Sequence, residues 1–165
     1  GDLEGALALE CHVQSQRRSS LRQHVVIGES LPFRIARHYA LLGERDAAER
    51  WLAFARKRRN FLQPHSGDVV EAMLRAREGR FGDAVAIYER IWTQLENGTT
   101  ADSMKAHRLI HALCLAGLRR DDKKVEQLVA GALPFGYEVV AVVAQWPELR
   151  AFLHERAPGE PLPDA

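Results

Sequence analysis

The residues of this chain best suited to chemistry lie in one short stretch, His107-x-x-x-His111-x-x-Cys114. On a helix, this spacing places two imidazoles and a thiol along one face, and all three groups are zinc ligands. One helix cannot surround a metal ion tetrahedrally, and the sequence shows no second group of ligands. We therefore interpret these residues as partly buried histidines beside an unreactive core thiol, and expect no metal.

Other reactive or charged side chains give no pattern of an enzyme. The basic run Arg56-Lys57-Arg58-Arg59 could contact phosphates, but at a helix C-terminus it also complements the helix dipole. His65 and Ser66 are adjacent, so on a helix they point in different directions and make a poor base and nucleophile. The sequence also lacks a glycine-rich phosphate loop, a Gly-x-Ser-x-Gly elbow and a His-Glu-x-x-His helix. We expect no enzymatic activity, no catalytic residue and no cofactor.

Composition narrows the class of protein further. A chain of 165 residues with 46% hydrophobic residues suits one packed domain. The 23 Lys and Arg balance 22 Asp and Glu, so no overall charge favours nucleic acid or an anionic membrane. No apolar run reaches the roughly 20 residues that span a bilayer. Two cysteines favour a reducing, cytoplasmic setting, and the missing initial methionine suggests a piece of a larger protein.

The elements that must carry these residues are helices in pairs. Gly43, Gly79 and Gly117 each follow one helix-like stretch and precede a second amphipathic stretch, and they lie 36 and 38 residues apart. Such a period is typical of stacked helical hairpins. Apolar residues recur at helical spacing almost throughout, so we predict an all-α fold.

We predict one domain over residues 1–156, followed by a proline-rich tail over 157–165 that is disordered or a linker. Ser30, a plausible N-cap before Pro32, starts the first complete hairpin. The predicted segments are a half-repeat at 1–16, an irregular stretch at 17–29, hairpins at 30–60, 65–96 and 101–133, and a short closing hairpin at 134–156.

Within this frame, the chain resembles the tetratricopeptide repeat (TPR) family with degenerate repeats. The first hairpin carries the residue types of that repeat at Ile35-Ala36-x-x-Tyr39, Gly43, Ala48-x-x-x-Leu52 and Ala55. The second hairpin matches at Ala72, Gly79, Ala84 and Tyr88. It departs at Arg75, which replaces the aromatic Tyr39, and the third has Asp122 in place of the packing alanine. The resemblance implies a right-handed superhelix, an α-solenoid that binds other proteins, and it names no ligand.

In TPR arrays the first helix of each hairpin lines a concave groove. Carried over to this chain, that rule gives a mixed apolar and cationic set of partner-binding residues: Phe33, Arg34, Arg37, Val69, Met73, Arg77, His107, Arg108 and His111. Arginines pair with carboxylates, so the groove would suit a peptide or helix with acidic side chains. The alternative is that these arginines only solvate a helix face.

The sequence thus predicts a protein-protein interaction scaffold that binds a partner peptide or helix in its concave groove. A second hypothesis is a small-molecule sensor or regulatory domain of a larger bacterial signalling or transcription-regulating protein. The two differ in the expected site, since a small-molecule pocket is enclosed and a peptide groove is open and long. A third hypothesis is self-association through the end of the array at Gly1.

Overall fold

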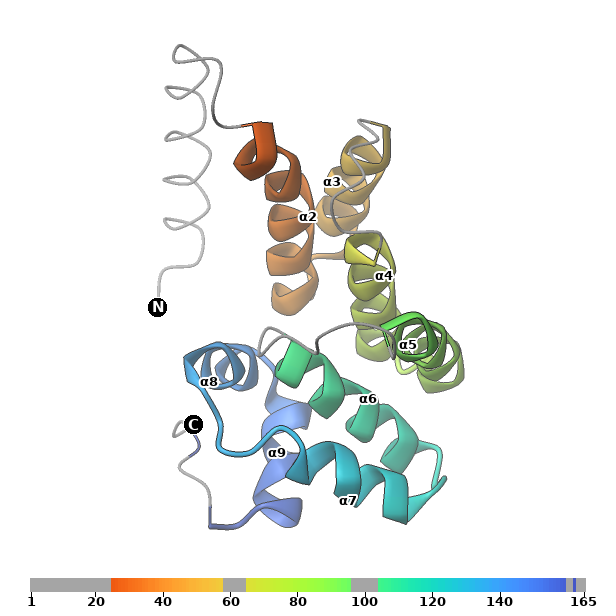
Figure 1. Cartoon of the computed structure of the whole chain (residues 1–165), viewed down its shortest axis with the longest axis vertical. Helices are drawn as coiled ribbons and strands as arrows, with labels where there is room; N and C mark the ends of the chain where they lie inside the picture. The colour runs from red at the N-terminus through yellow and green to blue at the C-terminus, as the bar shows by residue number, and fades with distance from the viewer. Residues whose placement is uncertain (1–24, 58–64, 96–103, 160–161, 163–165) are drawn as a thin grey trace.

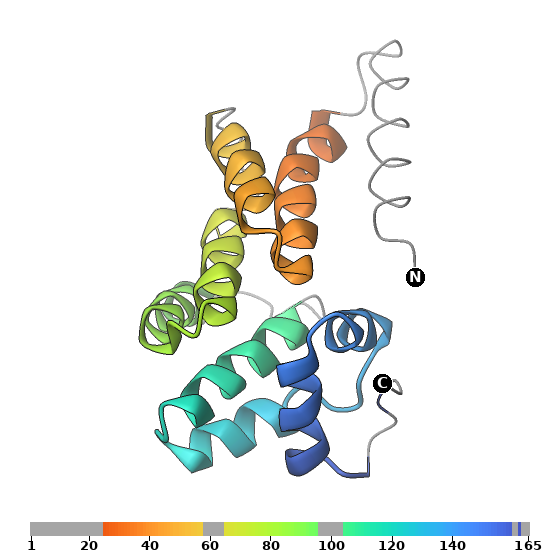
Figure 2. The same ribbon diagram turned by 180° about the vertical axis from the view of Figure 1, so that it is seen from behind.

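The computed structural model of the protein describes residues 25–57, 65–95, 104–159 and 162. These residues form eight helices and no strand, so the prediction of an all-α fold is confirmed for this part of the chain. The helices follow one another in pairs along a curved body (Figures 1 and 2). The predicted half-repeat at 1–16 lies outside the described residues.

The first two pairs are α2 (Val25–Leu42) with α3 (Arg45–Lys57), and α4 (Ser66–Arg77) with α5 (Phe81–Leu95). Helix α2 begins five residues before the predicted start at Ser30 and includes the end of the stretch predicted to be irregular. Pro32 is therefore inside the helix instead of in its first turn. Its ring removes one backbone hydrogen bond, a loss that a helix of 18 residues with a packed face tolerates.

The other two pairs are α6 (Lys105–Gly117) with α7 (Asp122–Ala130), and α8 (Tyr137–Ala144) with α9 (Pro147–Arg156). The two helices of each pair contact each other. Helix α4 also packs on α2 and α3, and α6 packs on α4 and α5, while α8 and α9 both pack on α6. Part of the predicted tail joins this body, because Ala157 is buried and Leu162 packs against the core.

The turns within the hairpins define which positions are equivalent. Gly43 (φ 78°) and Gly79 (φ 72°) both adopt the left-handed conformation, which glycine reaches without steric cost. In the third hairpin Arg119 (φ 53°) and Asp121 (φ 45°), the N-cap of α7, are both left-handed, and Gly117 is not. The hydrogen bonds identify Arg119 as the equivalent position, because the amides of Glu44, Arg80 and Arg120 donate to the carbonyls five residues earlier, at 2.9 Å, 2.9 Å and 3.0 Å. The repeat therefore runs Gly43, Gly79, Arg119.

Gly117 has a different role, because it lies at the end of α6 beneath an aromatic ring. A Cβ atom at this position would lie 2.5 Å from the ring of Phe81, the first residue of α5. Glycine is thus required here for close packing between α5 and α6. Seven residues before each of the three equivalent turn positions lies an alanine: Ala36, Ala72 and Ala112. All three are fully buried, and their small side chains let the helices approach closely.

Candidate functional site

Four of the nine residues predicted to line a concave groove lie in the core instead. Val69, Met73, His107 and His111 expose between 0 and 7% of their surface. Val69 and Met73 lie ten and six residues before the turn glycine Gly79, and both are buried, so the helix face that the family rule assigns to the groove packs inward here. The burial of the two histidines agrees with their interpretation as buried residues beside the core thiol of Cys114.

Three of the other predicted groove residues lie on α2. Arg34 is exposed, whereas Phe33 and Arg37 are half-buried. Phe33 packs against the main core. The charge of Arg37 reaches His107 and, together with burial as the larger cause, lowers the pKa of that imidazole to about 3. The structure therefore does not gather the predicted set on one open surface.

Arg77, another predicted groove residue, ties three segments together. Its guanidinium donates to the carbonyl of Leu41 near the end of α2 and, at 2.6 Å, to that of Gln145 at the end of α8. The same group stacks on the Trp146 ring, 4.4 Å from its centroid, and lies 3.7 Å from a carboxylate oxygen of Glu148. Burial lowers the pKa of Arg77, while Glu148 opposes that shift. The surface around Arg77 is thus occupied by the α8–α9 hairpin.

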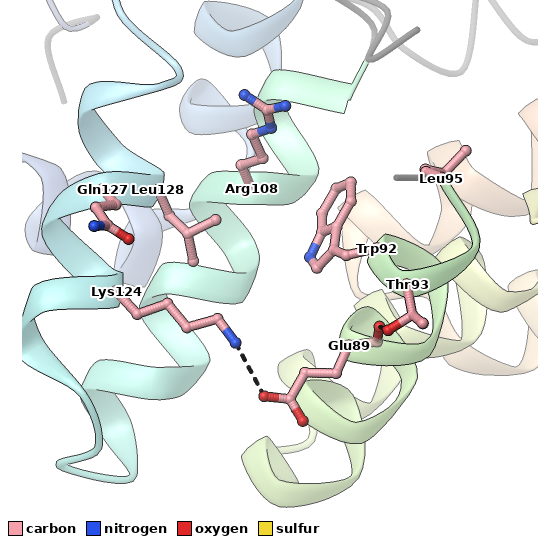
Figure 3. Close-up of a pocket in the computed structure, with 8 residues that line it drawn as sticks. All are labelled: Glu89, Trp92, Thr93, Leu95, Arg108, Lys124, Gln127 and Leu128. Atoms are coloured by element: carbon pink, nitrogen blue, oxygen red, sulfur yellow. Dashed lines mark hydrogen bonds and ion pairs between the residues drawn. The ribbon is translucent and has the colours of Figure 1, made fainter. Parts of the chain in front are cut away.

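A groove with a volume of about 550 Å³ lies among α5, α6 and α7 (Figure 3). We call it the Trp92 groove. Its lining combines apolar side chains with a rim of polar and charged ones. The lining residues are Glu89, Trp92, Thr93 and Leu95 of α5, Arg108 of α6, and Lys124, Gln127 and Leu128 of α7. Arg108 is the one predicted site residue among them.

Trp92 is the largest side chain of the groove, and its ring is held in place. The indole Nε1 donates a hydrogen bond to Nδ1 of His111, at 2.9 Å. Tyr88, one turn earlier on α5, stacks on both rings, with centroids 6.2 Å from Trp92 and 5.4 Å from His111. The indole therefore forms a fixed apolar wall, with its polar atom turned to the core.

Charges mark the rim of the groove on either side of this wall. The Nζ of Lys124 lies 3.1 Å from Oε1 of Glu89, so an ion pair links α7 to α5. Arg108 donates to the backbone carbonyl of Gly131 at 3.3 Å, and no carboxylate of the described residues pairs with it. In Figure 3, Arg108 and the Glu89–Lys124 pair lie on opposite sides of the Trp92 ring. Within the described residues, Lys124 of the groove thus has a carboxylate partner and Arg108 has none.

This lining can bind but has no arrangement for covalent catalysis. Its one carboxylate, on Glu89, is in the ion pair, and the Thr93 hydroxyl donates to the backbone carbonyl of Glu89 at 2.9 Å. The nearby Cys114 thiol is buried, and burial raises its pKa to about 12, so it is not a nucleophile at neutral pH. Among the described residues, no group of three His, Cys, Asp or Glu side chains could hold a metal ion.

Sequence reasoning missed most of this site. Nothing in the local pattern around Trp92 separates a half-buried tryptophan from a buried one. The spacing of Tyr88 and Trp92, one helical turn apart, predicts a shared face but not how much of that face a neighbouring helix covers. Leu128 and Lys124 belong to a different hairpin, so their position beside Trp92 depends on the packing of α7.

Comparison of the chain with family models, with curated proteins and with solved structures finds no match. Its class rests on the part of the chain that the structure describes, which forms successive helical hairpins with a groove on one side. A search of the helices in the described ranges finds none with the length and apolar character to cross a bilayer.

Proposed function

We propose that this chain is a non-enzymatic helical-repeat scaffold that binds a peptide or helix of a partner protein in the Trp92 groove. The observation that carries the proposal is the fixed indole wall of Trp92, flanked by Leu95 and Leu128 and open to solvent. Tryptophan and arginine are enriched among the residues that dominate binding energy at interfaces. Because the indole is already ordered, a partner would not have to pay for ordering it.

The charges of the groove favour a partner with an acidic side chain. Lys124 is paired with Glu89, whereas Arg108 has no carboxylate partner in the described part of the chain. A carboxylate at the Arg108 end would complete an ion pair, whereas at the other end it would meet a lysine already paired with Glu89. The partner is therefore expected to place an apolar side chain on Trp92 and an acidic one beside Arg108.

The order of helix contacts supports a stacked array as the scaffold. Each of α4 and α6 packs on both helices of the preceding hairpin, which is how TPR-like hairpins stack into an α-solenoid. We extend the proposal to a TPR-like right-handed superhelix. The buried, unpaired thiol of Cys114 is in keeping with a reducing, cytoplasmic setting.

A small-molecule sensor would use the same groove differently. The volume of about 550 Å³ lies within the range of small-ligand sites. Such sites bury most of their ligand, however, while the Trp92 groove is only partly enclosed by the described residues. We therefore favour an extended ligand, and treat a small molecule as the competing outcome of the experiment.

Selection of a random-peptide phage library on the whole chain tests the proposal. We expect enriched peptides that combine an apolar and an acidic residue, and that lose at least about tenfold in affinity for the Leu128→Glu and Arg108→Glu variants. Matched control variants are Ala151→Glu and Arg50→Glu, at exposed positions outside the groove. Peptides that bind Leu128→Glu as well as the unaltered chain would place the binding site elsewhere. A failure to enrich any peptide would contradict the scaffold proposal and favour the sensor.

A further inference from the structure

The hydrogen bond between Trp92 and His111 links the groove to the interior. The indole N–H can donate but cannot accept, so Nδ1 of His111 must be the unprotonated acceptor. The neutral imidazole then carries its proton on Nε2, which has no partner among the described residues. His111 itself is fully buried. The His111 imidazole is thus held in one tautomer by its hydrogen bond with Trp92.

The surroundings of His111 keep it neutral. Burial is the main cause that lowers its pKa to about 4; Lys124 of α7 lowers it further and Glu89 of α5 opposes. No other element contributes a charge to this shift. Tyr88 stacks on the imidazole at 5.4 Å and is itself neutral, since burial raises its pKa well above the usual value. At neutral pH the acceptor is therefore always available to the indole.

We propose that His111 is a positioning residue that holds the Trp92 indole in the orientation that forms the wall of the groove. The role of His111 in partner binding rests on the proposed function, whereas its contact with Trp92 does not. If the side chain at position 111 could not accept, the indole N–H would be buried without a partner in this orientation. The ring would therefore turn so that the N–H could bond water. The groove would then lose its fixed apolar wall, and a partner would have to reorder the ring on binding.

The experiment compares His111→Leu, which removes the acceptor, with His111→Gln, whose amide oxygen can accept in place of the imidazole. The first readout is the indole Nε1–H signal in ¹⁵N NMR spectra, assigned with Trp92→Phe. The second is the affinity for the tightest peptide from the phage selection. The matched control is His107→Leu, on the same helix, which removes a buried imidazole whose ring centroid lies 6.3 Å from that of Tyr88 and which does not bond Trp92.

We expect His111→Leu to shift the indole signal, to speed exchange of its proton, and to weaken the peptide roughly fivefold through the cost of reordering the ring. His111→Gln should retain both properties, and His107→Leu should change neither. A purely structural role would lower the melting temperature and leave the indole signal of the folded protein unchanged. An unchanged indole signal or unchanged affinity in His111→Leu overturns the inference.

The indole signal needs no ligand, so failure of the inference is separate from failure of the proposed function. If peptides bind the groove but the Trp92 indole signal is the same in His111→Leu and the unaltered chain, the positioning role alone is refuted. If His111→Leu does not fold, the unaltered chain still provides the test. Its Trp92 signal should move as His111 gains a proton near its pKa of about 4. A signal that stays constant until the protein unfolds overturns the inference.

Discussion

Replacing Arg77 with alanine should uncouple the closing hairpin from the rest of the molecule. Its guanidinium bonds two carbonyls that lie at helix C-termini, those of Leu41 near the end of α2 and of Gln145 after α8. Carbonyls at helix ends have no partner within their own helix, and the negative end of the helix dipole favours a cation there. Arg77 therefore satisfies groups from two helices that are distant in sequence.

The magnitude follows from these contacts. A hydrogen bond from a charged donor contributes roughly 1.5–3 kcal/mol, and a cation–π contact such as that with Trp146 adds about 0.5–2 kcal/mol. The exposed Glu148 adds little because water screens it. Desolvation of the guanidinium, seen in its lowered pKa, offsets part of the sum. We expect Arg77→Ala to cost about 3 kcal/mol of unfolding free energy, close to 10 °C in melting temperature.

Urea unfolding followed by circular dichroism measures this loss, and Arg75→Ala is the matched control on the same helix. Arg75 makes only loose ion pairs, 3.6 Å to Glu71 and 3.4 Å to Glu78, so its removal should cost below about 1 kcal/mol. Arg77→Lys should recover about half of the loss, since one ammonium cannot reproduce the planar fork. Amide exchange in α8 and α9 should accelerate in Arg77→Ala. Equal losses of unfolding free energy in Arg77→Ala and Arg75→Ala would refute the conclusion that Arg77 holds the closing hairpin in place.

The other predictions concern acid and the third turn. The pKa values of His107 and His111, about 3 and about 4, lie below the ordinary 6.5, so the unfolded state binds more protons between these values. Stability should therefore fall as pH drops from 6.5 toward 4, by several kcal/mol at about 1.4 kcal/mol per pKa unit, and urea midpoints of His111→Gln should fall less steeply. At the third turn, Arg119→Gly should raise the unfolding free energy by up to about 1 kcal/mol, because glycine adopts a positive φ without strain. Gly117→Ala should lower the unfolding free energy, because the added Cβ atom displaces the Phe81 ring. A loss of stability in Arg119→Gly together with a gain in Gly117→Ala would contradict the turn register.

The sequence sufficed for the fold class because the decisive signals are local. Helical spacing of apolar residues and the glycines at 43 and 79 predict the first two complete hairpins, and these appear with turns at those residues. A positive φ at glycine follows from the lack of a Cβ atom, so these turns can be read directly. The early start of α2 could not be read in this way, because Pro32 inside a helix contradicts the usual position of proline.

The site was harder to predict because it depends on register and packing. Gly117 has the residue type of a turn glycine, but the left-handed conformation is two residues later, at Arg119. His107 and His111, interpreted from their spacing as partly buried, are buried in the structure. Their assignment to the groove came from the family rule, which does not indicate how closely neighbouring helices pack on that face. Arg77 was predicted to line the groove because the first helix of each TPR hairpin does so, and nothing local indicates that the α8–α9 hairpin covers it.

The position of the Trp92 groove follows from how α5, α6 and α7 meet. The ion pair between Lys124 and Glu89 sets the start of α7 beside the middle of α5. Leu128, one turn further along α7, therefore lines the groove together with Trp92. The indole remains half-buried, because these helices do not cover its outer side completely. A partner helix seated in the groove would bury the exposed part of Trp92, which is why we place the binding function there.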